Sequence, residues 1–491
     1  MHNAQCAMRN AQCAMRNAHC IIIYRVLLSS DGSARQQVRP PTQHQTTSEY
    51  IKQESMRKHT ELLSGWGNSI IEKTTLIRPE FIADLSQLNE DSQSIIARGC
   101  GRSYGDVAFN PNGLTMLTTR FNRFIAFDEN TAELTCESGV TLRDIQQTFI
   151  PRGYALITSP GTADVTIGGA IANDVHGKNH ERVGSFGNHI IWIELLLSSG
   201  EIIRCSQKEN AILFFATIGG LGLTGIITRV CLQLQKQPAS VSVKNEMIPD
   251  VSTCLSRLKA VRETATYSVA WLDMSSHQYF GRGVLSTAEP DHTLTAFSKN
   301  TPKSVPPLAH LFLNDFTIRL HNQWHYFQES RAEKESVQSL MTYLYPLDGI
   351  QNWNKLYGKR GFYQFQCVIP DDAAEDGIKE IIKAVSNSAE KPYLSVLKTF
   401  GSEGRGLLSF PLRGFTLAMD FPNKQNTLAL LHKLEDIAVA HHGRLYFAKD
   451  ACMQAKHLEK MYPKINEFRD VLKEYDALHR WQSRLSRRLG V

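Results

Sequence analysis

No apolar run in this 491-residue sequence is long enough to cross a membrane. The nearest candidate, residues 20–28, is short and is broken by Arg25, whereas a spanning helix needs about 20 apolar residues. A strong charge of one sign is also lacking, because the net charge is +6 and only +3 of it remains after residue 55. So small an excess argues against a nucleic-acid-binding protein and against strong electrostatic attraction to a membrane.

Close cysteine pairs are lacking as well. Seven of the ten cysteines follow residue 55, mostly in apolar strings such as RVCLQL and FQCVIP. An odd number without a CxxC pair favours reduced core thiols in a reducing compartment, so we expect a cytoplasmic protein. His176, His180 and His189 have metal-ligand chemistry, but a glycine and an asparagine separate the first two. A loop is favoured there over an aligning helix, and we predict no metal site.

A tandem seven-residue repeat opens the chain and places cysteines at positions 6, 13 and 20. It offers neither the close ligand pairs of a metal site nor the apolar a and d positions of a coiled coil. We interpret residues 1–55 as a disordered extension outside the folded domains, consistent with translated repetitive DNA, and Met56 as the candidate start of the protein.

Strands and helices are mixed in the rest of the chain, which predicts an α+β fold. The expected strands include residues 124–128, 133–140, 154–158, 190–205, 225–235, 268–274, 362–370 and 415–422. The expected helices are residues 141–153, 377–387, 426–443 and 469–490.

Glycine-rich stretches are the main chemical signal. A literal GxGxxG at residues 220–225 is followed by a β-branched run, so we interpret it as a tight turn entering a strand and reject a Rossmann fingerprint. Three further stretches, 99–106, 159–180 and 184–189, lie within about ninety residues of one another. They are either hairpin turns or loops that aim backbone N–H groups at a diphosphate, and their number favours a large phosphate-bearing cofactor.

Two features leave alternatives open. Residues 299–327 hold three prolines and a long apolar stretch, which fits a mobile cover over a site or an ordinary loop with a packed underside. Lys449 follows an apolar strand, and is either a solvated surface lysine or a buried functional amine.

Five motifs occur in one order: ARGCGRSYGD at 97–106, ESGVTL at 137–142, and the glycine-rich segments 160–180, 184–190 and 219–227. This order resembles the vanillyl-alcohol-oxidase superfamily with its PCMH-type FAD-binding domain, and within it the branch that oxidises polyprenylphosphoryl ribose. The resemblance continues through GRLYFAKD at 443–450 and covers the chain from about residue 63 to its end.

The resemblance implies a two-domain fold. The FAD-binding domain is discontinuous, formed by residues 56–240 and by a C-terminal return at 444–491. An inserted α+β substrate, or cap, domain occupies residues 241–443.

The resemblance also implies an FAD-dependent oxidoreductase acting on CH–OH groups. Its implied catalytic residues are Lys449, His176 and Tyr104, with the acceptor of the hydroxyl proton left open. The implied FAD-binding residues are Ala97, Arg98, Gly99, Cys100, Gly101, Arg102, Ser103, Tyr104, Gly105, Asp106, Gly161, Thr166, Ile167, Gly168, Gly169, Asn173, His176, Ile227 and Tyr446. The implied substrate-pocket residues are Lys178, Trp271, Gln366, Lys398, Thr416 and Ala418.

The reaction implied is oxidation of the ribose C2′ hydroxyl of polyprenylphosphoryl-β-D-ribose to a 2′-keto sugar, which a separate short-chain dehydrogenase/reductase converts to the arabinose form. A lipid substrate implies peripheral contact with the inner membrane, and it gives residues 299–327 a purpose as a flexible, membrane-facing cover. The alternatives are an oxidase of a soluble sugar or aldonolactone and a flavin protein that binds the lipid-linked sugar without oxidising it.

Three positions differ from known relatives. Arg102 stands where related sugar oxidases have a histidine linked to the flavin, so the resemblance implies noncovalent FAD. Thr416 and Ala418 replace an asparagine and a cysteine of well-known members. These changes imply an altered pocket wall that offers no thiol to an electrophile.

Overall fold

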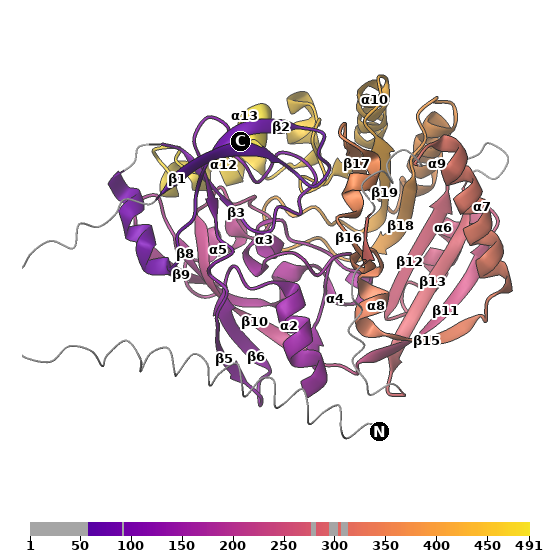
Figure 1. Cartoon of the computed structure of the whole chain (residues 1–491), viewed down its shortest axis with the longest axis horizontal. Helices are drawn as coiled ribbons and strands as arrows, with labels where there is room; N and C mark the ends of the chain where they lie inside the picture. Colours follow the sequence, from indigo (N-terminus) through magenta and orange to yellow (C-terminus); the bar gives the residue numbers. More distant parts are fainter. Residues whose placement is uncertain (1–56, 91–92, 276–280, 294–302, 306–312) are drawn as a thin grey trace, which may run out of the picture. The chain divides into compact units, whose positions relative to one another are not determined.

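The computed structural model describes residues 57–90, 93–275, 281–293, 303–305 and 313–491. Residues 54–491 form one compact unit, described here by itself. The interpretation of residues 1–55 lies outside the described residues, as do residues 299–302 and 306–312 of the expected cover. Helices and strands alternate along the described chain, which confirms the α+β class (Figure 1). Within it, no helix is both long and apolar enough to span a bilayer.

Two small sheets occupy the first half of the described chain. The four-stranded sheet has the order β1-β2-β4-β3, with β1 (Lys58–Ser64), β2 (Ile71–Ile77), β3 (Ile95–Arg98) and β4 (Leu114–Leu117). The six-stranded sheet has the order β5-β6-β10-β8-β9, with β7 paired to β10. Its strands are β5 (Phe124–Asp128), β6 (Glu133–Glu137), β7 (Tyr154–Leu156), β8 (Ile190–Leu196), β9 (Ile202–Ser206) and β10 (Ile226–Lys236). Four of the five strands expected in this region are present, whereas the run 190–205, expected as one strand, forms the antiparallel pair β8 and β9, which turns at Gly200 with φ +88°.

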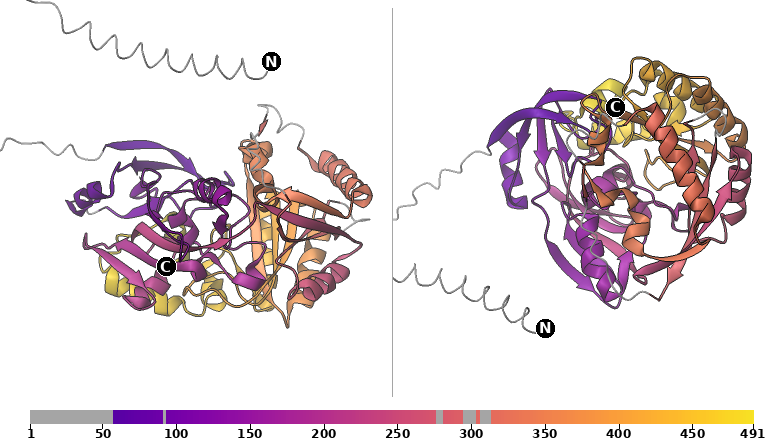
Figure 2. Two further views of the ribbon diagram at one scale, coloured as in Figure 1. Left: turned by 90° about the horizontal axis from the view of Figure 1, so that it is seen from below. Right: turned by 45° about the vertical axis from the view of Figure 1, so that its right-hand side comes forward.

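An eight-stranded sheet dominates the second half, in the order β15-β11-β13-β12-β18-β19-β17-β20. Its strands are β11 (Ser240–Ile248), β12 (Tyr267–Asp273), β13 (Arg282–Asp291), β15 (Glu335–Ser339), β17 (Phe362–Pro370), β18 (Leu394–Phe400), β19 (Gly414–Pro422) and β20 (Arg444–Leu445). In Figure 2 the orange strands β17 to β19 lie apart from the indigo strands β1 and β2. A short parallel pair, β14 (Lys303–Ser304) and β16 (Ile350–Gln351), stands outside this sheet.

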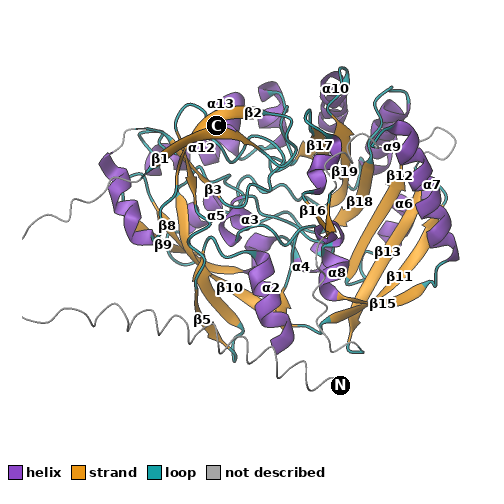
Figure 3. Cartoon of the chain, viewed as in Figure 1, coloured by secondary structure: helices purple, strands orange, loops and turns teal. Residues whose placement is uncertain are grey.

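Helices cover both faces of the eight-stranded sheet. On one face, α6 (Val251–Val261), α9 (Ala374–Ser386) and α10 (Thr427–Ala440) bury a core of aliphatic side chains such as Leu258, Leu272 and Leu417. The other face packs against α7 (Asp315–Arg331) and α8 (Leu340–Leu344). Figure 3 shows α7 beside strands β11 to β13. The remaining helices are α2 (Leu142–Phe149), α3 (Ile167–Ala172), α4 (His180–Val183), α5 (Ala211–Thr217), α11 (Leu458–Met461), α12 (Ile465–Tyr475) and α13 (Arg484–Leu489).

The end of the chain returns to its beginning. Trp481 forms a parallel bridge with Ile95 of β3, and Figure 1 shows the yellow helices α12 and α13 beside the indigo strands β1 and β2. Arg484 and Arg488 of α13 both bind the carboxylate of Asp106, which is fully buried. Residues nearly 400 apart in sequence are thereby joined by three charged hydrogen bonds.

The expected helix over residues 469–490 is wrong as one element. It is interrupted after Tyr475 because the Asp476 carboxylate accepts hydrogen bonds from the backbone N–H groups of Arg480 and Trp481. His479 adopts the left-handed conformation, with φ +49°. A short polar side chain that binds nearby backbone N–H groups competes with the helical ladder, and here it turns the chain so that Trp481 reaches β3.

Candidate active site

A cavity of about 650 Å³ lies between the glycine-rich loops and the eight-stranded sheet, a volume typical of ligand sites. Nineteen predicted site residues line it. Fifteen come from the FAD-binding prediction: Ala97, Gly99, Cys100, Gly101, Arg102, Ser103, Tyr104, Gly161, Thr166, Gly168, Gly169, Asn173, His176, Ile227 and Tyr446. The other four are Gln366, Lys398, Ala418 and Lys449.

Four residues of the FAD-binding prediction lie outside the lining and have structural contacts instead. Arg98 donates to the carbonyls of Ala108 and Ser64. Asp106 pairs with α13, and Ile167 is fully buried in the core. A Cβ on Gly105 would lie 1.6 Å from the backbone oxygen of Asp450, so this glycine permits close packing of the C-terminal segment rather than access to the cavity.

Three residues of the substrate-pocket prediction also lie outside the lining. The Lys178 ammonium donates to the carbonyl of Tyr343 and lies 4.0 Å above that residue's ring. Trp271 packs edge-on against His325 of α7, with centroids 4.7 Å apart. Thr416 lies behind the lining, where its hydroxyl accepts a hydrogen bond from Gln366 at 3.1 Å.

The loop after β3 presents backbone donors without partners. The N–H groups of Cys100, Gly101, Arg102 and Ser103 donate to no acceptor in the described part of the chain. Gly101 has φ +64°, and successive turns of this kind aim N–H groups into a concave anion site. A Cβ on Gly99 would lie 2.2 Å from the Thr166 hydroxyl oxygen, so the loop depends on glycine to approach α3. These donors suit a diphosphate.

A charged cluster stands beside this loop. Arg102 lies 4.0 Å above the ring of Trp66 and 3.3 Å from the carboxylate of Asp164. Arg143 bridges Asp164, at 2.5 Å, and Asp348, at 2.8 Å. All five side chains line the cavity, and the buried Nε of Arg102 has no partner among the described residues.

His176 is held at both ring nitrogens. Its Nδ1 lies 3.2 Å from the Lys398 ammonium and its Nε2 lies 3.0 Å from the Gln366 amide, while its ring contacts Phe400 at 4.6 Å. Burial, reinforced by the charge of Lys398, holds the pKa of His176 well below its usual value. Burial also lowers the pKa of Lys398 to about 8. His176 is therefore a neutral, fixed ring, and Lys398 is the charged member of the pair.

Lys449 is a half-buried amine that lines the cavity. Its ammonium lies 3.6 Å above the centroid of the Tyr104 ring. Burial lowers the pKa of Lys449, an effect that the nearby Asp420 carboxylate opposes. Of the two readings of Lys449, the structure therefore supports the amine of the cavity over the solvated surface lysine.

Asp420 and Gln364 escaped the sequence prediction. Asp420 is fully buried, and its Oδ1 accepts a hydrogen bond from the Gln364 amide, which lines the cavity. Its Oδ2 has no partner among the described residues. Burial raises the pKa of Asp420, and Lys449 opposes that shift. The one available signal was the spacing of polar residues in GFTLAMDFP and FYQFQCVIP, which places them on one face of paired strands.

The GxGxxG segment behaves as expected. Gly222 and Gly225 have φ +76° and +145°, and strand β10 begins directly after them. Both line the cavity, as does Leu221, so this turn contributes to the site without being a dinucleotide fingerprint.

His176 lies in an irregular segment and His180 begins α4, which confirms the loop between them. In the described ranges no three His, Cys, Asp or Glu side chains are grouped to hold a metal ion, and all seven cysteines there are unpaired.

The sequence of this chain is similar to those of known proteins. A family model described as an FAD binding domain matches residues 78–206. The chain is 33% identical over 454 residues to decaprenylphosphoryl-beta-D-ribose oxidase of Mycolicibacterium smegmatis, covering 88% of this chain and 98% of that protein. L-gulonolactone oxidase of Scyliorhinus torazame is 28% identical over 199 residues, covering 39% of this chain and 44% of that protein. This chain thus belongs to the decaprenylphosphoryl-β-D-ribose oxidase family of FAD-dependent oxidoreductases.

Proposed function

We propose that this enzyme oxidises the ribose C2′ hydroxyl of a polyprenylphosphoryl-β-D-ribose to the 2′-keto sugar. The observation that carries the proposal is the presence, in one cavity, of two features: four backbone donors at Cys100 to Ser103 that have no acceptor among the described residues, and the amines of Lys398 and Lys449, whose pKa values burial lowers. Similarity along most of the chain supports the substrate. The segment that matches L-gulonolactone oxidase is much shorter.

The lining fits FAD. The unpaired N–H groups of residues 100–103 would hold the diphosphate, and Gly161, Gly168 and Gly169 leave room beside them. Arg102 would interact with the cofactor through charge alone, because a guanidinium does not form the covalent link that a histidine makes at this position. We propose noncovalent FAD.

When bound, FAD supplies the acceptor for the hydride that leaves C2′. The chain's own residues handle the proton and the geometry. Lys449, whose lowered pKa keeps a share of it neutral near neutral pH, takes the hydroxyl proton at its Nζ. The resulting ammonium then stabilises negative charge that develops nearby. Tyr104 fixes the amine by lying against it, and His176 positions the substrate from the Gln366 side.

Lys398 suits the phosphate of the substrate. It lines the cavity, and its ammonium has no carboxylate partner in the part of the chain that the structure describes. A buried cation without a counter-charge is costly, because desolvation favours its neutral form. An anionic phosphate would supply that counter-charge and raise the pKa of Lys398. Burial, together with the charge of Lys398, lowers the pKa of the neighbouring Lys178 to about 7, so Lys178 carries only part of a positive charge near neutral pH.

Anaerobic titration of the flavin tests the function. The purified enzyme is mixed with a short-chain polyprenylphosphoryl ribose, and the visible spectrum is recorded without oxygen. Bleaching of the flavin bands is the expected result. Bleaching by free sugars or lactones alone would favour the soluble-sugar alternative, and a spectral shift without bleaching would leave only a binding protein.

We also propose the domain division at residues 56–240, 241–443 and 444–491. The bridge of Trp481 to Ile95 and the pairing of α13 with Asp106 support the return of the C-terminal segment to the FAD-binding domain. The 2′-keto product requires a reductase to complete an epimerisation, and a short-chain dehydrogenase/reductase is the proposed partner. A polyprenyl substrate further requires access to a membrane, and we propose peripheral contact with the inner membrane.

A further inference from the structure

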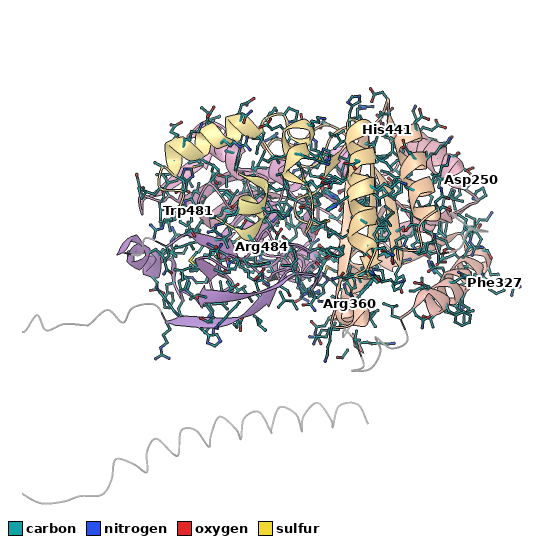
Figure 4. The ribbon with its side chains drawn as sticks, turned by 90° about the horizontal axis from the view of Figure 1, so that it is seen from above. Asp250, Phe327, Arg360, His441, Trp481 and Arg484 are labelled. Carbon is teal, nitrogen blue, oxygen red and sulfur yellow. The ribbon has the colours of Figure 1, made fainter. Side chains whose placement is uncertain are left out.

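Helix α7 is built with its apolar side outward. Phe316, Leu320, Trp324 and Phe327 are between 50% and 72% exposed, and their spacing of four, four and three residues places them on one stripe. Figure 4 labels Phe327 on α7, at the edge of the described chain. A helix on a globular protein ordinarily turns such a stripe toward the core. Here the stripe meets solvent.

Polar contacts hold the opposite side of α7 on the sheet. Asn322, which is buried, donates to the carboxylate of Asp273 at 3.0 Å. Glu329 accepts from the Asn245 amide at 2.9 Å. The guanidinium of Arg282 lies 4.3 Å above the ring of Tyr326.

The start of α7 is also fixed. Asn314 caps the helix by accepting from the N–H groups of Phe316 and Thr317, and Asp315 pairs with Lys424 at 2.8 Å. With both the inner side and the first turn anchored by polar groups, the outward direction of the apolar stripe is set by specific contacts.

Helix α7 packs on the sheet face that also borders the cavity. Trp271, which contacts α7, pairs in register with Val396, which lines the cavity. Before α7, β14 pairs with β16, whose residues Ile350 and Gln351 also line the cavity. Strand β14, which precedes α7 in the chain, therefore lies beside the site.

We propose that this stripe, formed by Phe316, Leu320, Trp324 and Phe327, is the surface by which the enzyme docks on a phospholipid bilayer that contains anionic lipid. The proposal rests on the proposed function, since a polyprenyl substrate resides in such a bilayer. Phenylalanine, leucine and tryptophan beside arginine form the composition of helices that lie in a membrane interface. The flanking Arg319 and Arg331 are exposed, form no ion pair with a described residue, and complement an anionic surface.

Vesicle co-sedimentation tests the docking surface. The full-length holoenzyme is mixed with vesicles of phosphatidylcholine and phosphatidylglycerol, and compared with the variant Leu320→Ser/Trp324→Ser/Phe327→Ser. The matched control is Leu62→Ser/Ile212→Ser/Leu478→Ser. It replaces three apolar side chains outside α7 that are between 66% and 82% exposed. We expect the wild type and the control to sediment with vesicles and the α7 variant to lose at least tenfold in affinity. Wild-type enzyme that stays in the supernatant, or an α7 variant that binds as well as the control, overturns the proposal.

Two readouts separate this proposal from the proposed function. The α7 variant should reduce its flavin at the wild-type rate with a short-chain substrate in solution, and more slowly with a long-chain substrate in vesicles. If the flavin bleaches in neither the wild type nor the α7 variant, the proposed function is wrong. The vesicle experiment still tests membrane docking in that case. Gel filtration that shows a wild-type dimer dispersed by the α7 substitutions would assign the stripe to a second copy of the chain. If the α7 variant binds vesicles as well as the wild type, and residues 306–312 are protected from protease by the vesicles, membrane docking would be assigned to residues 306–312 instead.

Discussion

The ammonium of Lys449 lies 3.6 Å above the centre of the Tyr104 ring. Both residues line the cavity. Their cation–π contact joins the C-terminal segment of the chain to the glycine-rich loop after β3. The same amine is influenced by Asp420 on β19. Its charge state is therefore controlled by burial and by the charges of Asp420 and Lys398.

Replacement of the amine tests its role. Lys449→Met should retain FAD, since the diphosphate loop is untouched, and should slow flavin reduction by about 10²- to 10⁴-fold, the usual contribution of a positioned acid–base group. Stopped-flow absorbance of the flavin under anaerobic conditions measures it. Tyr104→Phe keeps the ring beneath the amine and is the control, expected to change the rate far less. A normal rate in Lys449→Met would remove this residue from the chemistry.

The buried carboxylate of Asp420 should tune the pH dependence. Burial lowers the pKa of Lys449 and Asp420 raises it, so Asp420→Asn should lower that pKa further. If neutral Lys449 takes the hydroxyl proton, the rate of flavin reduction rises with pH as Lys449 deprotonates. In Asp420→Asn the acidic limb of this pH profile should therefore lie at lower pH than in the wild type. The rate of flavin reduction is measured across neutral pH, with Asp372→Asn on the exposed surface as the control. A limb that moves to higher pH contradicts the assignment.

Lys398 should matter for binding more than for chemistry. Lys398→Gln removes the cation proposed to meet the substrate phosphate, and we expect KM for the phosphate-bearing substrate to rise about tenfold or more, with a smaller change in kcat. Steady-state kinetics at several substrate concentrations separate the two constants. An unchanged KM would place the phosphate elsewhere.

Asp106 should stabilise the fold although it belongs to the glycine-rich motif. Its buried carboxylate pairs with Arg484 at 2.7 Å and with Arg488 at 2.9 Å. Breaking such a buried network costs about 3–5 kcal/mol, so Asp106→Asn should lower the urea midpoint of unfolding clearly. The exposed pair of Glu246 and Arg257 is the comparison, and Glu246→Gln should cost about 1 kcal/mol or less. Equal effects of the two substitutions would show that the Asp106 network is dispensable.

The flavin should separate from the polypeptide on denaturation. Arg102 faces the cavity between Trp66 and Asp164 and offers no covalent attachment. Acid precipitation is expected to give a colourless pellet and a yellow supernatant. A yellow pellet after washing would mean that another side chain is linked to the cofactor.

Local sequence determined a large part of this molecule. Glycines 99 and 101 in a short loop after an apolar strand predicted backbone donors aimed at a phosphate-bearing cofactor, because only residues without a side chain allow that approach. Alternating apolar residues predicted strands such as β5 and β17 within a residue or two. These features depend on neighbours in the chain, so the residue pattern contains them.

Tertiary structure alone decided the rest. Asp420 and Gln364 share a face with Lys398 because β17, β19 and β18 pair in one register, and a shift by one residue would turn each side chain to the opposite face. The outward apolar stripe of α7 depends on polar partners on β11, β12 and β13, which its own sequence does not contain. The closure of the site by Lys449 and α13 joins segments more than 300 residues apart, and such contacts are set by packing of the whole chain rather than by any local preference.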